Sequence, residues 1–377
     1  ILEMITLEEN QANIQLIKIL SAVNLLPLDV TENANAKDVE IKKKKCSNIS
    51  VKLKTETNIW KWKTIFLLVV IQALYTTIRL LEVVLNRNVA FNAEHFPVHI
   101  MWVVCDICFG FLGYTWFIKW PEYTVTVINR VLSSLREGKK PRKDLQLNRQ
   151  ELLAKYVGPN LCIVWFVFIL VITHDKTRIH LFFTALPEAY QSDGTFWALT
   201  IVEAICLAYI SSMSFLVTLC HVIFVDATNS FVKSTERELR RCTVGQQLRE
   251  QQAVELCSNI RHLQLYMQIF NRSNRFVIFA YKLICITLSV VGGTFAIRFT
   301  AASPLVGLIC IVSFVDCMGF FGLIYENAFQ IPSNTGRAKQ QMLVAIQGIK
   351  NKGKVSEVTK FIKSVPTNCR TACYAAI

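Results

Sequence analysis

Six ionisable side chains stand inside long apolar stretches of this sequence, where a charged group is costly in lipid and normally has a partner or a function. They are Arg79, Glu82, Asp106, Glu203, Lys282 and Asp316. Arg79 and Glu82 are three residues apart, so on a helix they would share one face and could neutralise each other. For each of the six residues, a satisfied buried pair and a ligand contact both stay open as interpretations.

Residue types that perform catalysis or bind metals are not clustered here. His99, His174 and His180 fall at or near the ends of apolar segments and lack metal-ligand spacing, which predicts ordinary surface or interfacial histidines. Cys105 and Cys108 form a CxxC pair within an apolar segment, where small apolar helix residues are a better explanation than a metal or redox site. We therefore expect no enzyme activity, no metal and no cofactor.

Aromatic and polar residues gather in the outer halves of the apolar segments, that is, the halves on one side of the membrane. This predicts a ligand pocket, because ligand cavities are largely apolar and helix bundles form them between helices. The candidate lining residues are Tyr75, Trp102, Asp106, Phe166, Phe168, Trp197, Thr200, Glu203 and Phe295. Aromatic side chains also face lipid, so the sequence leaves open which way each ring points.

Six apolar segments must position these residues, and each has the roughly twenty largely apolar residues that crossing a bilayer requires. They span residues 64–85, 98–118, 156–173, 195–225, 276–299 and 304–327. The composition agrees, with 53% hydrophobic and 18% charged residues, a mean hydropathy of +0.37 and a net charge of +14. The fold class we predict is an all-α integral membrane protein, with an N-terminal segment 1–63, a bundle 64–329 and a C-terminal segment 330–377.

Orientation follows from the Lys and Arg residues outside the spans, which are enriched on the cytoplasmic side. Segments 1–63, 119–155, 226–275 and 330–377 hold thirty-five of them, whereas 86–97, 174–194 and 300–303 hold three. This bias predicts a cytoplasmic N-terminus. The basic residues lie mostly between spans rather than on one folded face, which argues against nucleic-acid binding. None of the thirteen Cys falls in the three outer loops, so no external disulfide is expected.

The N-terminal segment predicts a short helix followed by a polar loop. Residues 14–26 show apolar positions at helical spacing and stop at Pro27, which predicts an amphipathic helix on or beside the membrane. Residues 29–58 are polar, and we expect the run Lys42–Lys45 to lie in a loop near anionic lipid. Four tryptophans fall at the predicted cytoplasmic ends of spans, where such rings favour the headgroup level. They are Trp60, Trp62, Trp116 and Trp120.

Cytoplasmic helices are predicted beyond the last three spans. Apolar residues recur at helical spacing over 246–270 and 338–349, and 355–365 predicts a further short helix. These helices could form a cytoplasmic bundle or a subunit interface. The candidate interface residues are Leu256, Ile260, Leu263, Met342, Ile346, Ile349 and Phe361.

Three stretches resemble the arthropod chemoreceptor superfamily, which comprises the gustatory and odorant receptors. IKILSAVNLLPL at 17–28 resembles the short helix ending in Pro ahead of that family's first span. RHLQLYMQIFNRSNRF at 261–276 is similar to its Leu-rich helix ending in Phe-Asn before span five. FIKSVPTNCRTACYAAI at 361–377 resembles its approach to the last span, although Cys373-Tyr374 stands where the family has a Gly and an aromatic residue.

The resemblance implies seven spans, and thus a further, pore-lining span after residue 377. It implies a homo- or hetero-tetrameric, ligand-gated, non-selective cation channel in the plasma membrane of chemosensory neurons. Tastants or odorants would bind in the outer half of each bundle, and the cytoplasmic helices would pack into a central anchor. The signature that separates the two branches lies in the seventh span, and general divergence favours the gustatory branch.

Other membrane proteins fit the sequence less well. A G-protein-coupled receptor would need an outer N-terminus and usually an outer disulfide. A voltage-gated channel would repeat Arg every third residue and carry a pore loop between spans five and six, where only a few residues are present. A secondary transporter is the strongest rival, although it should show paired halves or helices broken by Gly or Pro. A membrane enzyme should show clustered His or carboxylates at one depth.

Overall fold

Six long apolar helices dominate the computed structural model, which describes residues 11–33, 48–85, 94–134, 149–178, 180–244, 250–347 and 360. Within these residues, six helices are long and apolar enough to cross a membrane. They are α2 (Glu56–Leu85), α3 (Phe96–Gly113), α5 (Arg149–His174), α6 (Asp193–Val244), α7 (Glu250–Phe299) and α8 (Pro304–Gln347). Each contains one predicted segment, with α3 continued by the π-helical segment η1 (Tyr114–Lys119), so the prediction of six apolar helices is confirmed.

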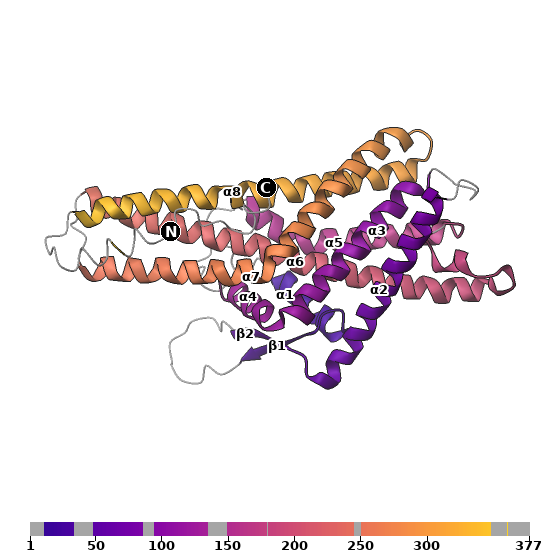
Figure 1. Ribbon diagram of the computed structural model, residues 1–377, viewed down its shortest axis with the longest axis horizontal. Helices are drawn as coiled ribbons and strands as arrows, with labels where there is room; N and C mark the ends of the chain where they lie inside the picture. The colour runs from indigo at the N-terminus through magenta and orange to yellow at the C-terminus, as the bar shows by residue number, and fades with distance from the viewer. Residues whose placement is uncertain are drawn as a thin grey trace.

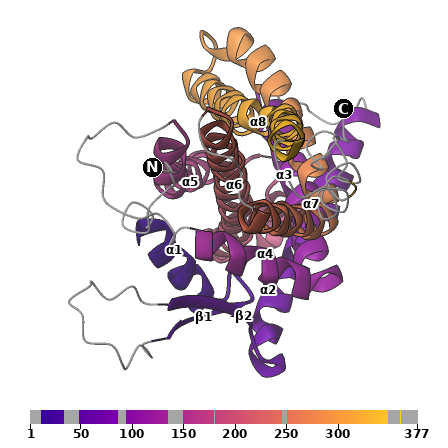
Figure 2. The ribbon, with the colours of Figure 1, turned by 90° about the vertical axis from the view of Figure 1, so that its left-hand side faces the viewer.

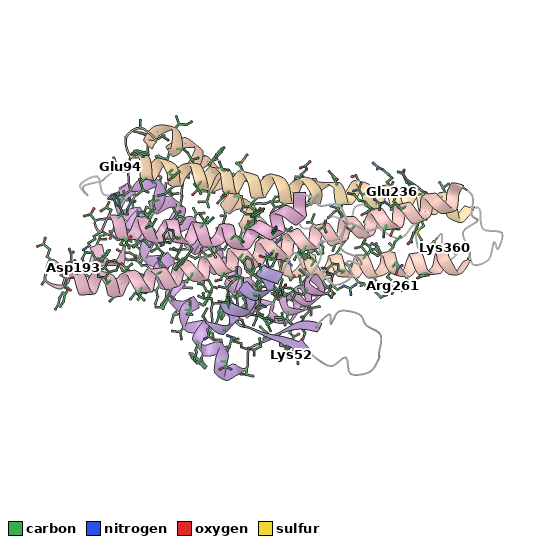
Figure 3. All side chains as sticks on the ribbon, turned by 180° about the vertical axis from the view of Figure 1, so that it is seen from behind. Lys52, Glu94, Asp193, Glu236, Arg261 and Lys360 are labelled. Carbon is green, nitrogen blue, oxygen red and sulfur yellow. The ribbon has the colours of Figure 1, made fainter. Side chains whose placement is uncertain are left out.

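The bundle has two distinct ends, and α6, α7 and α8 extend far beyond the other helices at one of them (Figure 1). We call this the extension end; Figure 3 shows Glu236 and Arg261 there. At the opposite end, which we call the loop end, α2 turns into α3, α5 into α6 and α7 into α8. Glu94 and Asp193 mark the loop end in Figure 3.

Helices α7 and α8 lie in close contact near the loop end because a glycine removes the side chain between them. A Cβ atom on Gly292 would lie 2.8 Å from the backbone oxygen of Cys310 and 3.2 Å from the nitrogen of Phe314. Small residues of this kind let the backbones of membrane helices approach each other. The turn between the two helices is short, and α8 starts at Pro304, a residue suited to the first helical turn because its missing N–H would be unpaired there anyway.

The polar N-terminal region contains a β-hairpin that the sequence did not predict, while the predicted loop around Lys42–Lys45 lies outside the described residues. β1 (Leu28–Asn33) and β2 (Asn48–Leu53) form an antiparallel pair in which Val30 faces Val51. The hairpin lies beside α1 (Gln11–Ala22) and α4 (Pro121–Ser134) (Figure 2). Asn129 of α4 binds the strand as a further strand would: its Oδ1 accepts from the Val51 N–H at 2.7 Å and its Nδ2 donates to the Val51 carbonyl at 2.8 Å.

Two of the tryptophans expected at the headgroup level are core residues instead. Trp62 is fully buried, stacks on Phe66 at a ring-centroid distance of 5.4 Å and meets the edge of Phe117 at 5.7 Å. Trp116 is also buried, and its Nε1 donates to Oδ1 of Asn274 at 3.1 Å. Both rings serve helix packing, because neighbouring helices cover these positions. Trp60 is 68% exposed, as the headgroup interpretation requires.

The extension end is helical where the sequence predicted helix. α7 begins at Glu250 and α8 continues to Gln347, and Gln341 donates from Nε2 to Oε1 of Glu236 on α6 at 3.3 Å. Among the candidate interface residues, Leu263 and Met342 are buried within this chain and Ile260 is half-buried. The remaining members of that set, and most of the predicted helix 355–365, lie outside the described residues or side chains: Leu256, Ile346, Ile349 and Phe361.

Candidate functional site

A cavity of about 150 Å³ lies in the middle of the bundle, among α3, α5, α6, α7 and α8. We call it the central cavity. Its walls are mostly apolar, with aromatic side chains from four helices: Trp102, Phe109, Phe168, Tyr281 and Phe320. A volume near 150 Å³ is what an engineered apolar cavity needs to bind benzene. The central cavity can therefore hold a compact organic molecule of roughly that size.

Polar groups enter the central cavity in rows that follow the helical repeat. Ser211, Ser214 and Thr218 come from one face of α6, at spacings of three and four residues. Ser313 and Asp316, three residues apart on α8, lie on the opposite wall. Asp316 is one of the six ionisable residues for which a ligand contact stayed open, whereas the four hydroxyl residues were not predicted, although the spacing of the hydroxyl groups along α6 was a readable signal.

One hydrogen bond crosses the wall of the cavity. The hydroxyl groups of Thr218 on α6 and Tyr281 on α7 are 2.8 Å apart and buried, so this pair joins the two helices at the floor of the site. Asp316 adds a carboxylate within reach of the same space. The arrangement can bind a ligand by apolar contact and orient it with a few hydrogen bonds, which is the usual division of labour in small-molecule sites. Among the described residues, no group of three His, Cys, Asp or Glu could hold a metal ion.

Two of the nine candidate ligand residues line the central cavity. Trp102 and Phe168 do so together, with their rings in edge-to-face contact at 5.5 Å. Phe166 and Trp197 are 58% and 53% exposed, on surfaces that would face lipid. Phe295 packs at the loop end against the rings of its aromatic neighbours rather than in the cavity.

The other four candidates lie between the helices or under the loop above the cavity. Asp106 is fully buried, with Oδ2 3.3 Å from Oγ1 of Thr76 on α2. Thr200 is buried on α6 without lining the cavity. Tyr75 and Glu203 hold the loop that follows α5, as described next. Of the two interpretations left open for Arg79 and Glu82, the structure shows the neutralising pair, with an N–O distance of 2.5 Å.

The 180–192 loop, which contains the short helices η2 (Phe182–Ala185) and η3 (Glu188–Tyr190), covers the loop end of the bundle. Tyr75 donates its hydroxyl to the carbonyl of Leu181 at 2.8 Å, and the N–H of Phe182 donates to Oε1 of Glu203 at 2.7 Å. Leu181 is buried in an apolar cluster with Trp102. The loop is thus fixed to α2 and α6, and it packs on Trp102 of α3, which lines the central cavity.

The histidines of this region are buried, which corrects the prediction of surface or interfacial positions for two of them. His99 and His180 are 3% and 1% exposed, and their rings lie 5.6 Å apart. The His180 ring also lies 5.4 Å from the ring of Trp102. His174 is exposed, as predicted. The sequence missed this cluster because helix periodicity does not reveal that a loop will fold over the ends of the spans.

Charges near the loop are arranged so that His180 stays neutral. Burial, together with His99, Arg178 and His95, keeps the pKa of His180 well below its usual range. Burial also lowers the pKa of His95, and the carboxylate of Asp175, 2.8 Å from its Nε2, offsets this in part. Burial lowers the pKa of the Arg178 guanidinium as well, against the attraction of Asp175 and Glu94. His180 is therefore a neutral side chain among charged neighbours at neutral pH.

Comparison with known proteins adds no assignment: no protein-family model matches this chain, and no curated protein matches it.

Proposed function

We propose that this chain is a subunit of a chemosensory cation channel, gated by a small, largely apolar molecule that binds in the central cavity. The observation that carries the proposal is the position of that cavity, which is shared by five of the six long apolar helices. A ligand there touches elements that also form the extension end. Ligand binding can change the packing of those helices if it favours one arrangement over another.

The cavity also sets the class of ligand. Its size limits the ligand to a compact molecule, and its mostly apolar wall favours hydrocarbon or aromatic character over sugars and amino acids. The hydroxyl groups of Ser211, Ser214 and Ser313 can bind one or two polar atoms. A small alcohol, ketone, ester or phenol fits these requirements.

The remaining parts of the proposal rest on charge and resemblance. The bias of Lys and Arg places the N-terminus and the extension end in the cytoplasm, with the loop end outside. The long extensions of α6, α7 and α8 would then serve as the anchor through which a tetramer assembles, and the pore helix would follow α8 in the chain. We place the channel in the plasma membrane of chemosensory neurons and favour a gustatory role over an odorant one.

The test is electrical recording from cells that express the complete reading frame containing this chain, during application of a panel of small alcohols, ketones, esters and phenols. We expect a non-selective cation current that persists when G-proteins are blocked. A current that disappears with G-protein blockade would refute the channel mechanism. Uptake of the compound without current would favour a transporter.

Two phenylalanine substitutions on α8 separate binding in the cavity from a general effect on the protein. Ser313→Phe places a ring in the cavity and should abolish the response to every active compound. Val315→Phe, on the same helix but at a position that is 57% exposed, should leave the response unchanged. If both variants respond like the unmodified protein, the ligand does not bind in the central cavity.

A further inference from the structure

We propose that the 180–192 loop is a lid over the central cavity, and that protonation of His180 releases it. The inference rests on the proposed function for treating the cavity as a ligand site. The release itself concerns the loop and its contacts, and it can be measured without ligand or current.

The loop is placed as a lid must be placed. Trp102 lines the cavity with one part of its side chain and contacts the loop through Leu181 and the His180 ring, at a ring-centroid distance of 5.4 Å. Figure 3 shows Asp193, where the loop ends, at the loop end of the bundle, away from the extensions. Detaching the loop would therefore uncover the Trp102 side of the cavity from the loop end.

Only a few polar contacts fix the lid. They include the hydrogen bonds from Tyr75 to the carbonyl of Leu181 and from the N–H of Phe182 to Glu203, and a side-chain hydrogen bond between Tyr75 and Thr184. The loop also contributes Phe183, whose ring meets Phe196 edge-on at 5.3 Å. Most of the residues from Ala185 to Ser192 are exposed, so the contacts of the lid are concentrated at its start, and a modest unfavourable free energy added there can open it.

Protonation of His180 supplies this unfavourable free energy, because the His180 ring is buried where a protonated ring nitrogen has no hydrogen-bond acceptor. Neither ring nitrogen has a hydrogen-bond partner among the described residues. The groups whose charges act on it are His99 from α3, His95 just before α3 and Arg178 from the segment before the loop, and all of them oppose a further positive charge. From the α2 side, the guanidinium of Arg79 is held in the ion pair with Glu82.

The acidic groups of the region act on other groups, and among them Glu94 attracts His95 and Arg178. Glu203 of α6 accepts from the Phe182 N–H, and Asp106 of α3 lies against Thr76. Asp175 binds His95 at 2.8 Å and accepts from the N–H of Thr177 at 2.9 Å. From α5, the neighbouring side chains around Trp102 are apolar. A protonated His180 is therefore more stable in water than under the closed lid.

The sign of the pH effect follows from this difference. An accessible histidine in an open lid has a pKa of about 6.5. Burial and the neighbouring positive groups hold the pKa of His180 in the closed lid well below that value. The open form therefore binds more protons, and acidification favours it. Between pH 7.5 and pH 5.5 the equilibrium constant for opening should increase about tenfold.

Hydrogen–deuterium exchange of the lid peptides, measured by mass spectrometry on the protein in lipid nanodiscs, tests the proposal. After correction for intrinsic exchange rates, protection of residues 180–192 should fall about tenfold from pH 7.5 to pH 5.5. In His180→Gln, which cannot take up the proton, protection should be the same at both pH values. His174→Gln is the matched control, because His174 is exposed and lies six positions before His180. In this variant the tenfold decrease should persist.

Two further measurements keep the test decisive. Glu203→Gln distinguishes an effect of His180 from an effect of the carboxylate that binds the lid. The tenfold pH effect should persist in this variant. Its loss would assign the effect to Glu203 and overturn the proposal. If His180→Gln does not fold, exchange of the histidine ring C–H in the unmodified protein reports the pKa of His180 directly. A value at or above 6.5 would also overturn the proposal.

Discussion

Replacement of Asn129 by leucine should loosen the β1–β2 hairpin without disturbing the bundle. The Asn129 amide satisfies both the N–H and the carbonyl of Val51, at 2.7 Å and 2.8 Å, and Val51 is fully buried. Since both groups point away from β1, Val30 and Val51 form a pair that is not hydrogen-bonded across the hairpin. Leucine would leave two backbone groups unsatisfied.

The magnitude follows from the loss of these two partners. Leaving a buried backbone group without a partner costs about 1–3 kcal/mol. Asn129 itself is only half-buried, so water can approach one side, and we take a total of about 2–3 kcal/mol from the lower part of that range. Since about 1.4 kcal/mol corresponds to a factor of ten, the opening of the hairpin should become roughly 30- to 150-fold more frequent.

Hydrogen–deuterium exchange of peptides covering 48–53 measures this opening locally. Asn129→Asp keeps an acceptor for the Val51 N–H but not the donor for its carbonyl, so it should show roughly half the free-energy effect. Thr126→Leu, one turn earlier on α4 and exposed, is the matched control and should leave exchange unchanged. Equal exchange in Asn129→Leu and Thr126→Leu would refute the role assigned to the amide.

Three further predictions concern the bundle. Gly292→Val should destabilise the α7–α8 contact by about 3 kcal/mol or more, because the new Cβ would lie 2.8 Å from the backbone oxygen of Cys310. Thermal unfolding in nanodiscs measures this loss of stability, and an unchanged unfolding midpoint would contradict it. Trp62→Ala should lower stability by about 3–5 kcal/mol, because the Trp62 ring is fully buried. Trp60→Ala should change stability by less than about 0.5 kcal/mol, because the Trp60 ring is 68% exposed. Similar unfolding midpoints for the two variants would be evidence against this packing. Because burial and its neighbours lower the pKa of His180, the folded protein binds fewer protons there than the unfolded chain, so stability should fall by up to about 1.4 kcal/mol per pH unit below about pH 6.5. The slope of the unfolding midpoint against pH should flatten in His180→Gln, and an unaltered slope would exclude this residue as the source.

Span positions could be predicted because length and apolarity alone determine them. The segment 304–327 begins where α8 begins, at Pro304, and the segment 276–299 ends where α7 ends, at Phe299. Both boundaries coincide with the short connection between two apolar runs. The distant ends of α6, α7 and α8 were predicted less sharply, since a helix that leaves the membrane continues by packing and amphipathic spacing rather than by apolarity.

The hairpin was missed for a different reason. LDVTEN and NISVKL are short and mostly polar, and they are separated by residues 34–47 rather than by a tight turn of the Asn-Gly kind. Their pairing depends on a distant partner, since Asn129 belongs to a helix 78 positions after Val51. Local propensity contains no information about such a contact.

The site could be predicted in kind but not in detail. A helix that is apolar on all sides gives no signal for the face that turns inward. Trp102 and Phe168 were therefore selected together with Phe166 and Trp197, although only the first two line the cavity. The spacing of the polar residues was more informative than aromaticity, because Ser211 and Ser214 lie on the inward face of α6.

The continuous course of α6 has a mechanical consequence. Its 52 residues correspond to a rod about 78 Å long, at about 1.5 Å per residue. If this rod pivots near its middle, a tilt of about 5° displaces each tip by roughly 3 Å in opposite directions. A displacement of that size exceeds the tolerance of close packing, in which even a single methylene is felt. A small displacement of α6 beside Ser211, which is closer to the middle of the helix than to its far tip, would then produce a larger displacement at that tip.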